Sequence, residues 1–206
     1  MSRLRKFRDL GAFIAAAIRS PTTVGAVAPS SSHLANQLTV VVPSGGEPVI
    51  VELGSGTGSV TAAIQRRLGG RGRHLAVELD PVLANYVRRQ NPGVEVVVGD
   101  AVGLRKILSE HGIHAVDAVI SGLPWALFSS GTQRDIIKVV TEVLCPWAAF
   151  TTFAYVHAFP MRGARQFRAL LDELFDEVLT THTVWRNVPP AVTYVCRRPR
   201  SLRAEN

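Results

Sequence analysis

The chain alternates between short apolar runs and longer amphipathic segments, and this alternation limits the folds that are open to it. Apolar runs rich in valine, isoleucine and alanine occupy residues 49–53, 74–79, 94–98, 115–121 and 148–155. Segments of helical length and pattern occupy residues 59–68, 81–89, 131–144 and 162–175. Strands that alternate with helices form βαβ units, in which the strands lie parallel and the helices cover the sheet.

Two further strand-like runs end this pattern. Residues 177–186 and 191–197 lie on either side of Pro189-Pro190 with no helix between them, which predicts an antiparallel hairpin. Before the first strand, Ser30-Ser31-Ser32 can cap a short helix that ends near Val42. We therefore predict an α/β fold, doubly wound and Rossmann-like, with a seven-stranded, mostly parallel sheet, a closing antiparallel hairpin and N-terminal helices.

Length and composition favour a single folded domain. With 206 residues, of which 47% are hydrophobic and 19% charged, the chain can bury one sizeable core. We assign residues 20–198 to one domain, flanked by residues 1–19 and a basic tail, 199–206, that we expect to be disordered. The two cysteines, Cys145 and Cys196, stand apart from any C-x-x-C or histidine-rich motif, so we predict neither a disulfide framework nor a metal site.

The net charge of +7 is concentrated at the two ends of the chain. Residues 1–19 hold five basic side chains against Asp9, and residues 197–206 hold four against Glu205. The residues between are formally neutral, whereas a long groove for nucleic acid would place excess positive charge on the folded body. This distribution favours contact with an anionic surface through the termini, and we expect no nucleic-acid partner.

Residues 1–19 have the pattern of a basic amphipathic helix. Leu4, Phe7, Leu10, Phe13 and Ile14 recur at spacings of three and four, with arginine and lysine largely between them. Such a helix can lie in the interface of an anionic membrane, which predicts a cytoplasmic protein that is peripheral on the inner face. Two alternatives are a helix packed on the protein's own core and a secretory signal. The second is disfavoured because Arg19-Ser20-Pro21 occupies the place where a signal peptide has its small-residue cleavage site.

A glycine-rich loop directly follows the first apolar run. Gly54-Ser55-Gly56-Thr57-Gly58 joins the predicted strand 49–53 to the predicted helix 59–68, and glycines at such a turn let a ligand approach the backbone closely. The dinucleotide fingerprint is G-x-G-x-x-G, but here the third glycine comes one position early and Ser59 takes its place. The loop therefore favours a ligand without a pyrophosphate.

Acidic residues end the next two predicted strands. Glu78 is followed by Leu79, and Asp100 is followed by Ala101. Carboxyl ends of parallel strands share one edge of the sheet, where open α/β sheets bind ligands and where a carboxylate can accept hydrogen bonds from ribose hydroxyls. Either acid alone is also a good helix N-cap, but the three strand ends together predict a pocket.

This combination resembles the class I S-adenosylmethionine-dependent methyltransferases over about residues 49–155. The resemblance implies that S-adenosylmethionine is the cofactor, with Gly54, Gly56 and Gly58 near its methionine part. Glu78 would bind the ribose and Asp100 the adenine amino group. The full set of predicted cofactor-binding residues is Glu52, Gly54, Ser55, Gly56, Thr57, Gly58, Glu78, Leu79, Asp100, Ala101 and Ser121.

A second motif, Ser121-Gly122-Leu123-Pro124-Trp125, ends the fourth predicted strand. It is similar to the Asn-Leu-Pro-Tyr of ribosomal RNA adenine dimethyltransferases, with Ser121-Gly122 in place of the asparagine. Four segments together look closely like the bacterial phospholipid N-methyltransferases, namely residues 23–31, 121–125, 155–157 and 186–191. This resemblance implies stepwise methylation of phosphatidylethanolamine towards phosphatidylcholine at a membrane, which the amphipathic helix would contact.

The chemistry suggests roles for several side chains. An amine attacks only when it is neutral, so Tyr155 or His157, or a water held by both, would accept its proton. Trp125 and Tyr155 could hold the methylated cation, and Arg186 or Arg165 could meet a lipid phosphate. The predicted catalytic residues are Tyr155, His157, Ser121, Pro124, Trp125 and Asn187.

Each of these assignments has a structural alternative. His157 could be a packed or surface histidine, Trp125 a core residue, Asn187 part of a turn, and Arg165 a solvated helix residue. Three functions compete for the whole chain: a phospholipid N-methyltransferase, a methyltransferase for ribosomal RNA adenine or another amine, and a membrane-surface module without catalysis. The short chain beyond the predicted sheet leaves no room for a separate RNA-binding domain, which disfavours the second.

Overall fold

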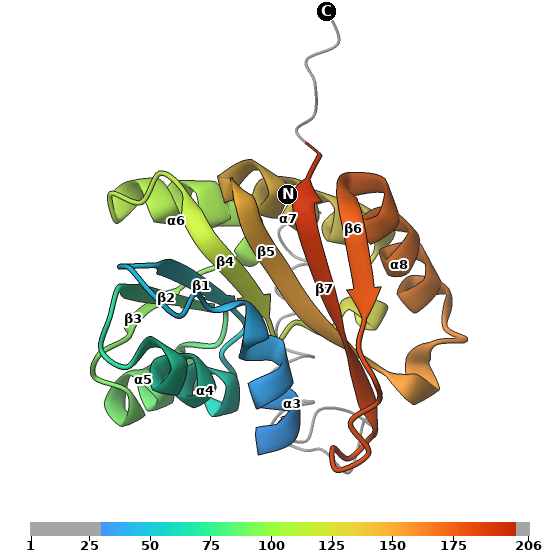
Figure 1. The fold of residues 1–206 in the computed structure, drawn as a ribbon, viewed down its shortest axis with the longest axis horizontal. Helices are drawn as coiled ribbons and strands as arrows, with labels where there is room; N and C mark the ends of the chain where they lie inside the picture. The colour runs from blue at the N-terminus through green and yellow to red at the C-terminus, as the bar shows by residue number, and fades with distance from the viewer. Residues whose placement is uncertain (1–29, 201–206) are drawn as a thin grey trace, which may run out of the picture.

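A seven-stranded sheet in the order β3-β2-β1-β4-β5-β7-β6 runs through the computed structural model, which describes residues 30–200 (Figure 1). The strands are β1 (Val49–Leu53), β2 (Arg73–Glu78), β3 (Glu95–Val98), β4 (Val116–Ser121), β5 (Leu144–Tyr155), β6 (Phe175–Thr180) and β7 (Ala191–Pro199). The helices are α3 (Ser32–Leu38), α4 (Ser59–Leu68), α5 (Pro81–Gln90), α6 (Leu104–Glu110), α7 (Ser130–Val143) and α8 (Arg162–Leu174). Four short 3₁₀ helices are η1 (Thr39–Val41), η2 (Ala101–Gly103), η3 (Trp125–Leu127) and η4 (Val156–Ala158).

The pairing of the strands confirms the predicted sheet. β1 pairs in parallel with β2 and β4, β2 with β3, and β4 with β5. β7 lies antiparallel between β5 and β6 and so forms the predicted closing hairpin with β6. The strand order reverses between β1 and β4, and in open α/β sheets the crevice beyond the carboxyl ends at such a point is where ligands bind.

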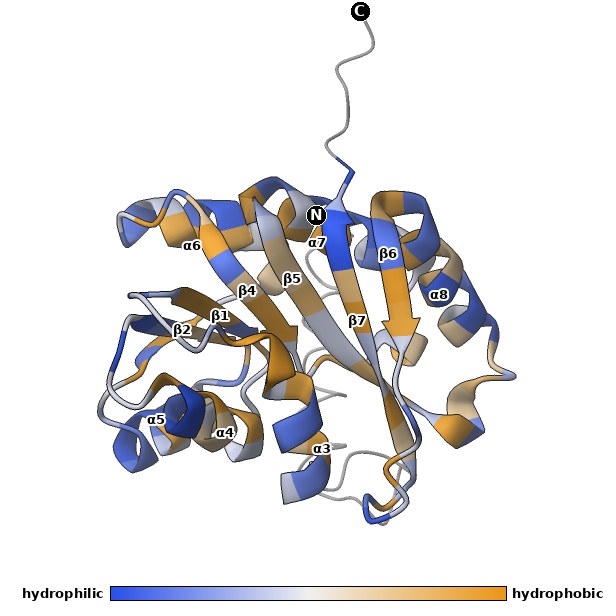
Figure 2. Ribbon diagram, viewed as in Figure 1, coloured by the Kyte–Doolittle hydropathy of each residue, from blue (hydrophilic) through white to orange (hydrophobic). Residues whose placement is uncertain are grey.

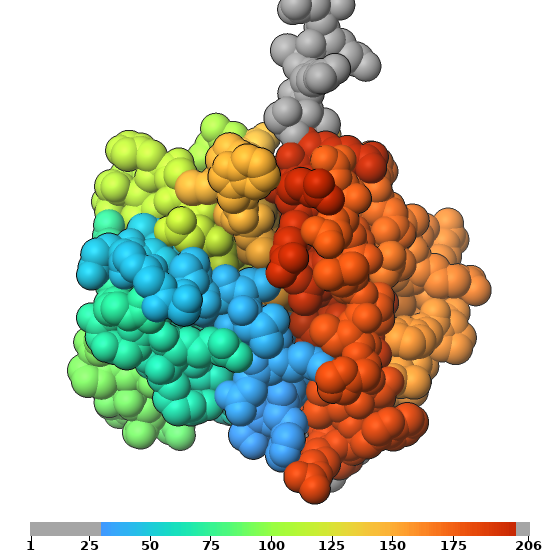
Figure 3. Space-filling model, viewed as in Figure 1, coloured from blue at the N-terminus to red at the C-terminus, as the bar shows by residue number. Residues whose placement is uncertain are grey.

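Helices cover both faces of the sheet. One apolar cluster joins α6, α7 and α8 to one face, while α3 and α4 pack against the other, with α5 packed on β2 and β3. Figure 2 shows hydrophobic residues along the strands and mixed faces on the helices that cover them. In Figure 3 the blue segment that contains α3 lies between the green region of α4 and the orange-red region that includes β7, and α3 contacts both α4 and β7.

Local signals in the sequence explain where the helices begin. The Ser31 hydroxyl accepts a hydrogen bond from Leu34 N at the start of α3, and Asp80 caps α5 immediately before Pro81. Ser129 caps α7 through the N–H of Thr132. Capping satisfies backbone donors that have no partner within the helix, so these residues fix the helix ends that border the sheet edge.

The predicted elements differ from the structure in three places. The sequence pattern missed α6, because its buried residues Leu104, Ile107 and Leu108 span little more than one turn. β5 begins at Leu144 rather than at residue 148. β6 spans Phe175–Thr180 rather than 177–186, because strand pairing with β7 stops at Thr180 and the following residues form a loop.

The predicted terminal segments lie largely outside the described residues. This holds for the basic helix of residues 1–19, for most of the motif at 23–31, and for residues 201–206. β7 reaches Pro199, and Arg200 Nε donates to Asp176, so the folded part extends past the predicted boundary at residue 198. Within residues 30–200, no helix has the length and apolar character needed to span a membrane.

The packing of α8 leads to a prediction about stability. Leu171 is fully buried in the cluster beneath α8, so we expect Leu171→Ala to lower the free energy of unfolding by roughly 2–5 kcal/mol. Leu179→Ala removes the same atoms from an exposed position and should change it by about 0.5 kcal/mol or less. Urea unfolding followed by circular dichroism measures both, and equal losses for the two variants would contradict the assignment of the core.

Candidate active site

The glycine loop between β1 and α4 depends on backbone conformations that favour glycine. Gly54, Gly56 and Gly58 have φ values of 75°, 52° and 86°. Gly54 N donates to Val77 O at 2.8 Å, which ties the loop to the end of β2. A Cβ atom on Gly54 would lie 2.9 Å from Leu123 Cδ2, so this loop and the turn after β4 are in close contact.

The surroundings of the loop fit a polar ligand. A Cβ on Gly56 would meet no atom within 4 Å, so space is open beside the loop. Among the described residues, Ser55 Oγ and Glu52 Oε1 are buried without a hydrogen-bond partner. Buried polar atoms are normally satisfied, so unsatisfied ones in and next to an open loop fit a site that takes a polar ligand such as S-adenosylmethionine.

Glu52 belongs to a buried polar cluster beneath the start of α4. Its Oε2 accepts a hydrogen bond from Thr61 Oγ1 at 2.8 Å and lies 3.2 Å from His74 Nε2. The other ring nitrogen of His74 lies 3.0 Å from Gln65 Nε2. Sequence reasoning missed Thr61, Gln65 and His74, although a histidine within an apolar strand was a signal that something polar lay opposite it.

Glu78 links the end of β2 to the glycine loop. Its Oε2 accepts from Gly56 N at 2.8 Å and its Oε1 from Asp80 N at 3.0 Å. Burial raises the pKa of the Glu78 carboxyl, and these backbone hydrogen bonds oppose the rise. The N-cap of α5 is Asp80, so Glu78 is not needed for capping and stands where it can accept hydrogen bonds from a ribose.

The predicted adenine side of the site is more open. Asp100 is exposed and caps η2 by accepting from Val102 N at 3.0 Å, as its N-cap interpretation predicts. Leu79 is an exposed apolar side chain that follows Glu78, and Ala101 is buried behind Asp100. These residues border the same sheet edge as Glu78 because Gly99 N donates to Glu78 O.

The turn after β4 forms a tight hydrogen-bonded unit. The Ser121 hydroxyl is fully buried and accepts from Leu123 N and from Trp125 Nε1, each at 3.2 Å. Trp125 Nε1 also donates to Thr152 Oγ1 at 2.8 Å, and the Thr152 hydroxyl donates to Ser121 O. Ser121 therefore shapes the turn, and its side chain does not line the pocket described below, contrary to its predicted place among the catalytic residues.

Trp125 has a different role from the one predicted. Its indole is 3% exposed and stacks on Phe167 with ring centroids 4.3 Å apart. Phe128 and Phe150 meet it edge to face. A ring this enclosed presents no open face to a head-group cation, so we correct its predicted cation–π role to that of a wall of the pocket.

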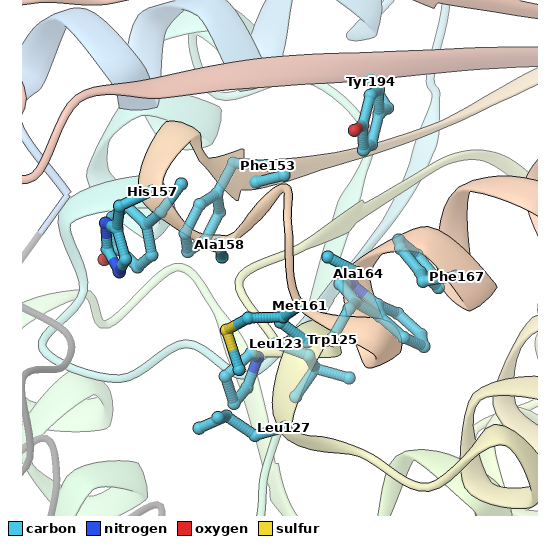
Figure 4. A pocket seen from close by; sticks show the side chains of 14 residues that line it. Leu123, Trp125, Leu127, Phe153, His157, Ala158, Met161, Ala164, Phe167 and Tyr194 are labelled. Atoms are coloured by element: carbon cyan, nitrogen blue, oxygen red, sulfur yellow. The ribbon is translucent and has the colours of Figure 1, made fainter.

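An apolar pocket opens beside this turn (Figure 4). Its volume is about 620 Å³, including the open space at its mouth. The walls come from the turn after β4, the end of β5, the start of α8 and β7. They consist of Leu123, Pro124, Trp125, Ala126, Leu127, Phe153, Ala154, Tyr155, His157, Ala158, Met161, Ala164, Phe167 and Tyr194.

Tyr155 and His157 lie next to each other in the wall of the pocket. Their rings stack with centroids 5.5 Å apart, and Phe153 meets Tyr155 edge to face. Burial raises the pKa of Tyr155 to about 12, so its phenol stays protonated at neutral pH and cannot accept a proton from an ammonium group. Of the two predicted proton acceptors, this leaves His157, whose imidazole is exposed and carries a ring nitrogen that can accept a proton.

The structure separates the other predicted residues from the pocket. Asn187 is 2% exposed, accepts a hydrogen bond from Ser31 N and donates to Pro189 O, so it holds a loop in place instead of meeting a substrate. Arg186 Nη1 lies 3.4 Å from His33 Nε2, and Arg165 is exposed on α8. In residues 30–200, no group of three His, Cys, Asp or Glu side chains is arranged to hold a metal ion.

Sequence reasoning missed most of the pocket walls. Leu127, Met161, Ala164 and Tyr194 come from elements far apart in the chain, and each has an ordinary apolar or aromatic side chain. Leu123 is the residue shared by both halves of the site, because it lines the pocket and contacts Gly54. The open space beside the glycine loop and the apolar pocket therefore adjoin each other at Leu123.

Comparison with known proteins gives matches to most of the chain and to parts of it. A family model described as "Methyltransferase domain" matches residues 50–147. An ornithine lipid N-methyltransferase from Singulisphaera acidiphila is 34% identical over 193 residues, covering 92% of this chain and 96% of that protein. A probable ribosomal RNA small subunit methyltransferase A from Pyrobaculum islandicum is 32% identical over 99 residues, which cover 48% of this chain and 37% of that protein.

Solved structures with the same fold have much lower sequence identity. The crystal structure of a SAM-dependent O-methyltransferase from Thermotoga maritima superimposes with a TM-score of 0.62 and 16% identity, covering 89% of this chain and 72% of that one. This likeness supports the doubly wound, Rossmann-like fold.

The contact between Gly54 and Leu123 leads to a prediction about cofactor binding. Gly54→Ala places a Cβ 2.9 Å from Leu123 Cδ2 and should lower the affinity for S-adenosylmethionine about tenfold or more, about 1.4 kcal/mol. Gly46→Ala is the matched control, because Gly46 has a similar φ of 72° but open space around it. Isothermal titration calorimetry measures both affinities; equal affinities in the two variants would refute the role of this contact.

Proposed function

Because this chain belongs to the class I S-adenosylmethionine-dependent methyltransferases, we propose that it methylates the amino group of a membrane-lipid head group. The observation that carries the proposal is the apolar pocket that shares Leu123 with the glycine loop. A relative that aligns with nearly the whole chain is named for N-methylating an ornithine lipid, and this supports the same class of acceptor.

The composition of the pocket suits a lipid amine. Its walls contain no Asp, Glu, Lys or Arg, and the polar groups that it offers include Tyr155 and His157. An apolar environment disfavours a charged ammonium, so it shifts a bound amine towards the neutral form that can attack a methyl group. The same walls favour the hydrocarbon near a lipid head group over the charged backbone of RNA.

The chain's own residues contribute mainly by positioning. When bound, S-adenosylmethionine supplies an electrophilic methyl group on a sulfonium. Ser55, Gly56 and Glu78 would hold it on one side of Leu123, and the pocket would hold the amine on the other. Holding two reactants at attack distance can contribute roughly 7–11 kcal/mol in favourable cases, so rigid contact between the two halves matters more here than any single acid or base.

Tyr155 and His157 have separate roles in this proposal. The Tyr155 phenol, with its pKa raised to about 12 by burial, stays neutral and orients the amine by a hydrogen bond. The His157 imidazole, stacked on Tyr155 at the pocket mouth, accepts the proton that the amine releases and passes it to solvent. As methyl groups accumulate, the Tyr155 ring is the pocket's aromatic surface for the resulting cation.

Residues 1–19 complete the proposal at the membrane. Their basic amphipathic pattern would place the enzyme on the anionic inner face of the cytoplasmic membrane, where its acceptor lies. Phosphatidylethanolamine and ornithine lipid are the two acceptors that we consider. The first follows from the likeness of four sequence segments to phospholipid N-methyltransferases, the second from the name of the relative.

Transfer of a labelled methyl group tests the proposal. The full chain is incubated with labelled S-adenosylmethionine and vesicles that contain either phosphatidylethanolamine or ornithine lipid, with ribosomal RNA in a parallel reaction. We expect label in the lipid fraction of at least one vesicle and none in RNA. Label in RNA alone would replace the proposal with the RNA function, which the match to a probable ribosomal RNA methyltransferase motivates.

A pair of variants on α8 tests whether the pocket is the acceptor site. Ala164 lines the pocket, so Ala164→Phe should fill part of it and lower lipid methylation about tenfold, about 1.4 kcal/mol in the barrier. Ala169→Phe adds the same ring to an exposed position on the same helix and should have little effect. Both variants should bind S-adenosylmethionine like the parent chain; full lipid methylation by Ala164→Phe would rule out this pocket.

A further inference from the structure

The loop between β6 and β7, residues 181–190, exposes two large apolar side chains. Trp185 is 73% exposed and Val188 is 76% exposed, whereas Asn187 between them is 2% exposed. Val184 is also buried and forms a bridge with Ala191. The loop therefore buries the polar Asn187 and exposes the apolar Trp185 and Val188, whereas folded proteins usually bury apolar side chains and expose polar ones.

Specific hydrogen bonds hold the loop in this form. Asn187 Oδ1 accepts from Ser31 N at 2.9 Å, and Asn187 Nδ2 donates to Pro189 O at 2.6 Å. Val184 N donates to Ala191 O at 2.7 Å. With its base fixed on both sides, the loop presents Trp185 and Val188 as a preformed tip. A tip of this kind loses little conformational freedom when it binds.

The loop also adjoins the pocket. Val156 N donates to Pro190 O at 3.0 Å, and Ala191 pairs with Tyr155 at the end of β5. Tyr155 and His157, on either side of Val156, form the polar wall of the pocket. In Figure 1 the loop lies at the end of the sheet where β5 ends and β7 begins. Whatever binds the loop tip is therefore held close to the mouth of the pocket.

Charge on the two segments that meet beside the pocket favours an anionic partner. Residues 153–165 and 181–191 contain Arg162, Arg165 and Arg186 and no Asp or Glu. Within residues 30–200, none of these three arginines forms a salt bridge. Leu127, Phe159 and Met161 are also exposed, and Leu127 and Met161 line the pocket. Exposed apolar groups flanked by arginines are typical of surfaces that enter the interface of an anionic bilayer.

We propose that Trp185, Val188 and Arg186 form a membrane-docking tip that sets the mouth of the pocket against the lipid head groups. Trp185 lies at the depth of the head groups, where tryptophan is enriched, with Val188 beside it and Arg186 at the lipid phosphates. This inference rests on the proposed function, in that the acceptor is a membrane lipid. It assigns to the folded domain a contact separate from residues 1–19.

The three tryptophans of the chain allow a direct test by fluorescence. Trp125 is buried, whereas Trp147 is 89% exposed near the start of β5, eight residues before Tyr155 and so roughly 26 Å along the strand from the pocket end. Trp147→Phe leaves Trp185 as the exposed reporter, and Trp185→Phe leaves Trp147. Each full-length variant is mixed with vesicles of phosphatidylcholine and anionic phosphatidylglycerol, with and without brominated acyl chains.

We expect the tryptophan emission of Trp147→Phe to shift to the blue on vesicles and to be quenched by brominated lipid. The emission of Trp185→Phe should show neither change, because its two remaining tryptophans, Trp125 and Trp147, do not enter the membrane. An unchanged Trp185 signal on bound vesicles overturns the proposal. A Trp185 signal that is already blue without vesicles also overturns it, because another part of the chain or a second copy then covers the tip. A blue shift of the Trp185 emission on addition of RNA, with none on addition of vesicles, also overturns the proposal.

Activity separates docking from the proposed function itself. The double variant Trp185→Ala/Val188→Ala should lower the ratio of methylation of lipid in vesicles to methylation of the same lipid in detergent micelles about tenfold, and Trp147→Ala should leave that ratio unchanged. Equal ratios in the two variants overturn the docking role. If no variant and no parent chain methylates lipid in either form, the proposed function fails, and the fluorescence result still decides whether the tip enters a membrane.

Discussion

The close approach of two turns, one after β1 and one after β4, is the constraint on which the rest of the site depends. Gly122 N donates to Leu53 O at 2.8 Å, and a Cβ on Gly122 would lie 2.6 Å from Gly54 O. These two strands are neighbours at the point where the strand order reverses. Because backbone meets backbone there, the glycine loop and the turn after β4 hold each other in place, and Leu123 both contacts the loop and lines the pocket.

Polar groups buried around this unit stabilise it from both sides. Glu52, Thr61 and His74 support the loop from below α4, and Ser121, Trp125 and Thr152 support the turn from the side of β5. A buried polar group that loses its partner costs about 1–3 kcal/mol, so these networks favour one arrangement of the two turns over others. The same logic extends to Asn187, whose buried hydrogen bonds fix a loop that exposes Trp185 and Val188.

Much of the fold and of the cofactor side of the site could be predicted from the sequence, because both depend on local signals. Apolar runs and turn residues located the strands, and the glycines with Glu78 located the loop and its acidic partner. The pocket was harder to predict, since its walls come from the turn after β4 and from β5, β7 and α8, and most of them carry no distinctive pattern. Asn187 was predicted to meet substrate, yet it is buried and does not line the pocket, because motif resemblance does not reveal which way a side chain points.

The central claim is that the pocket beside Leu123 brings a lipid amine to the methyl donor. Mass spectrometry of lipids from cells that express this chain tests it most directly, with cells that express the Gly54→Ala variant as the reference. We expect amine-bearing lipids that are heavier by one or more methyl groups, present with the parent chain and strongly reduced with the variant. Identical lipid profiles, with the parent chain folded and able to bind S-adenosylmethionine, would contradict it.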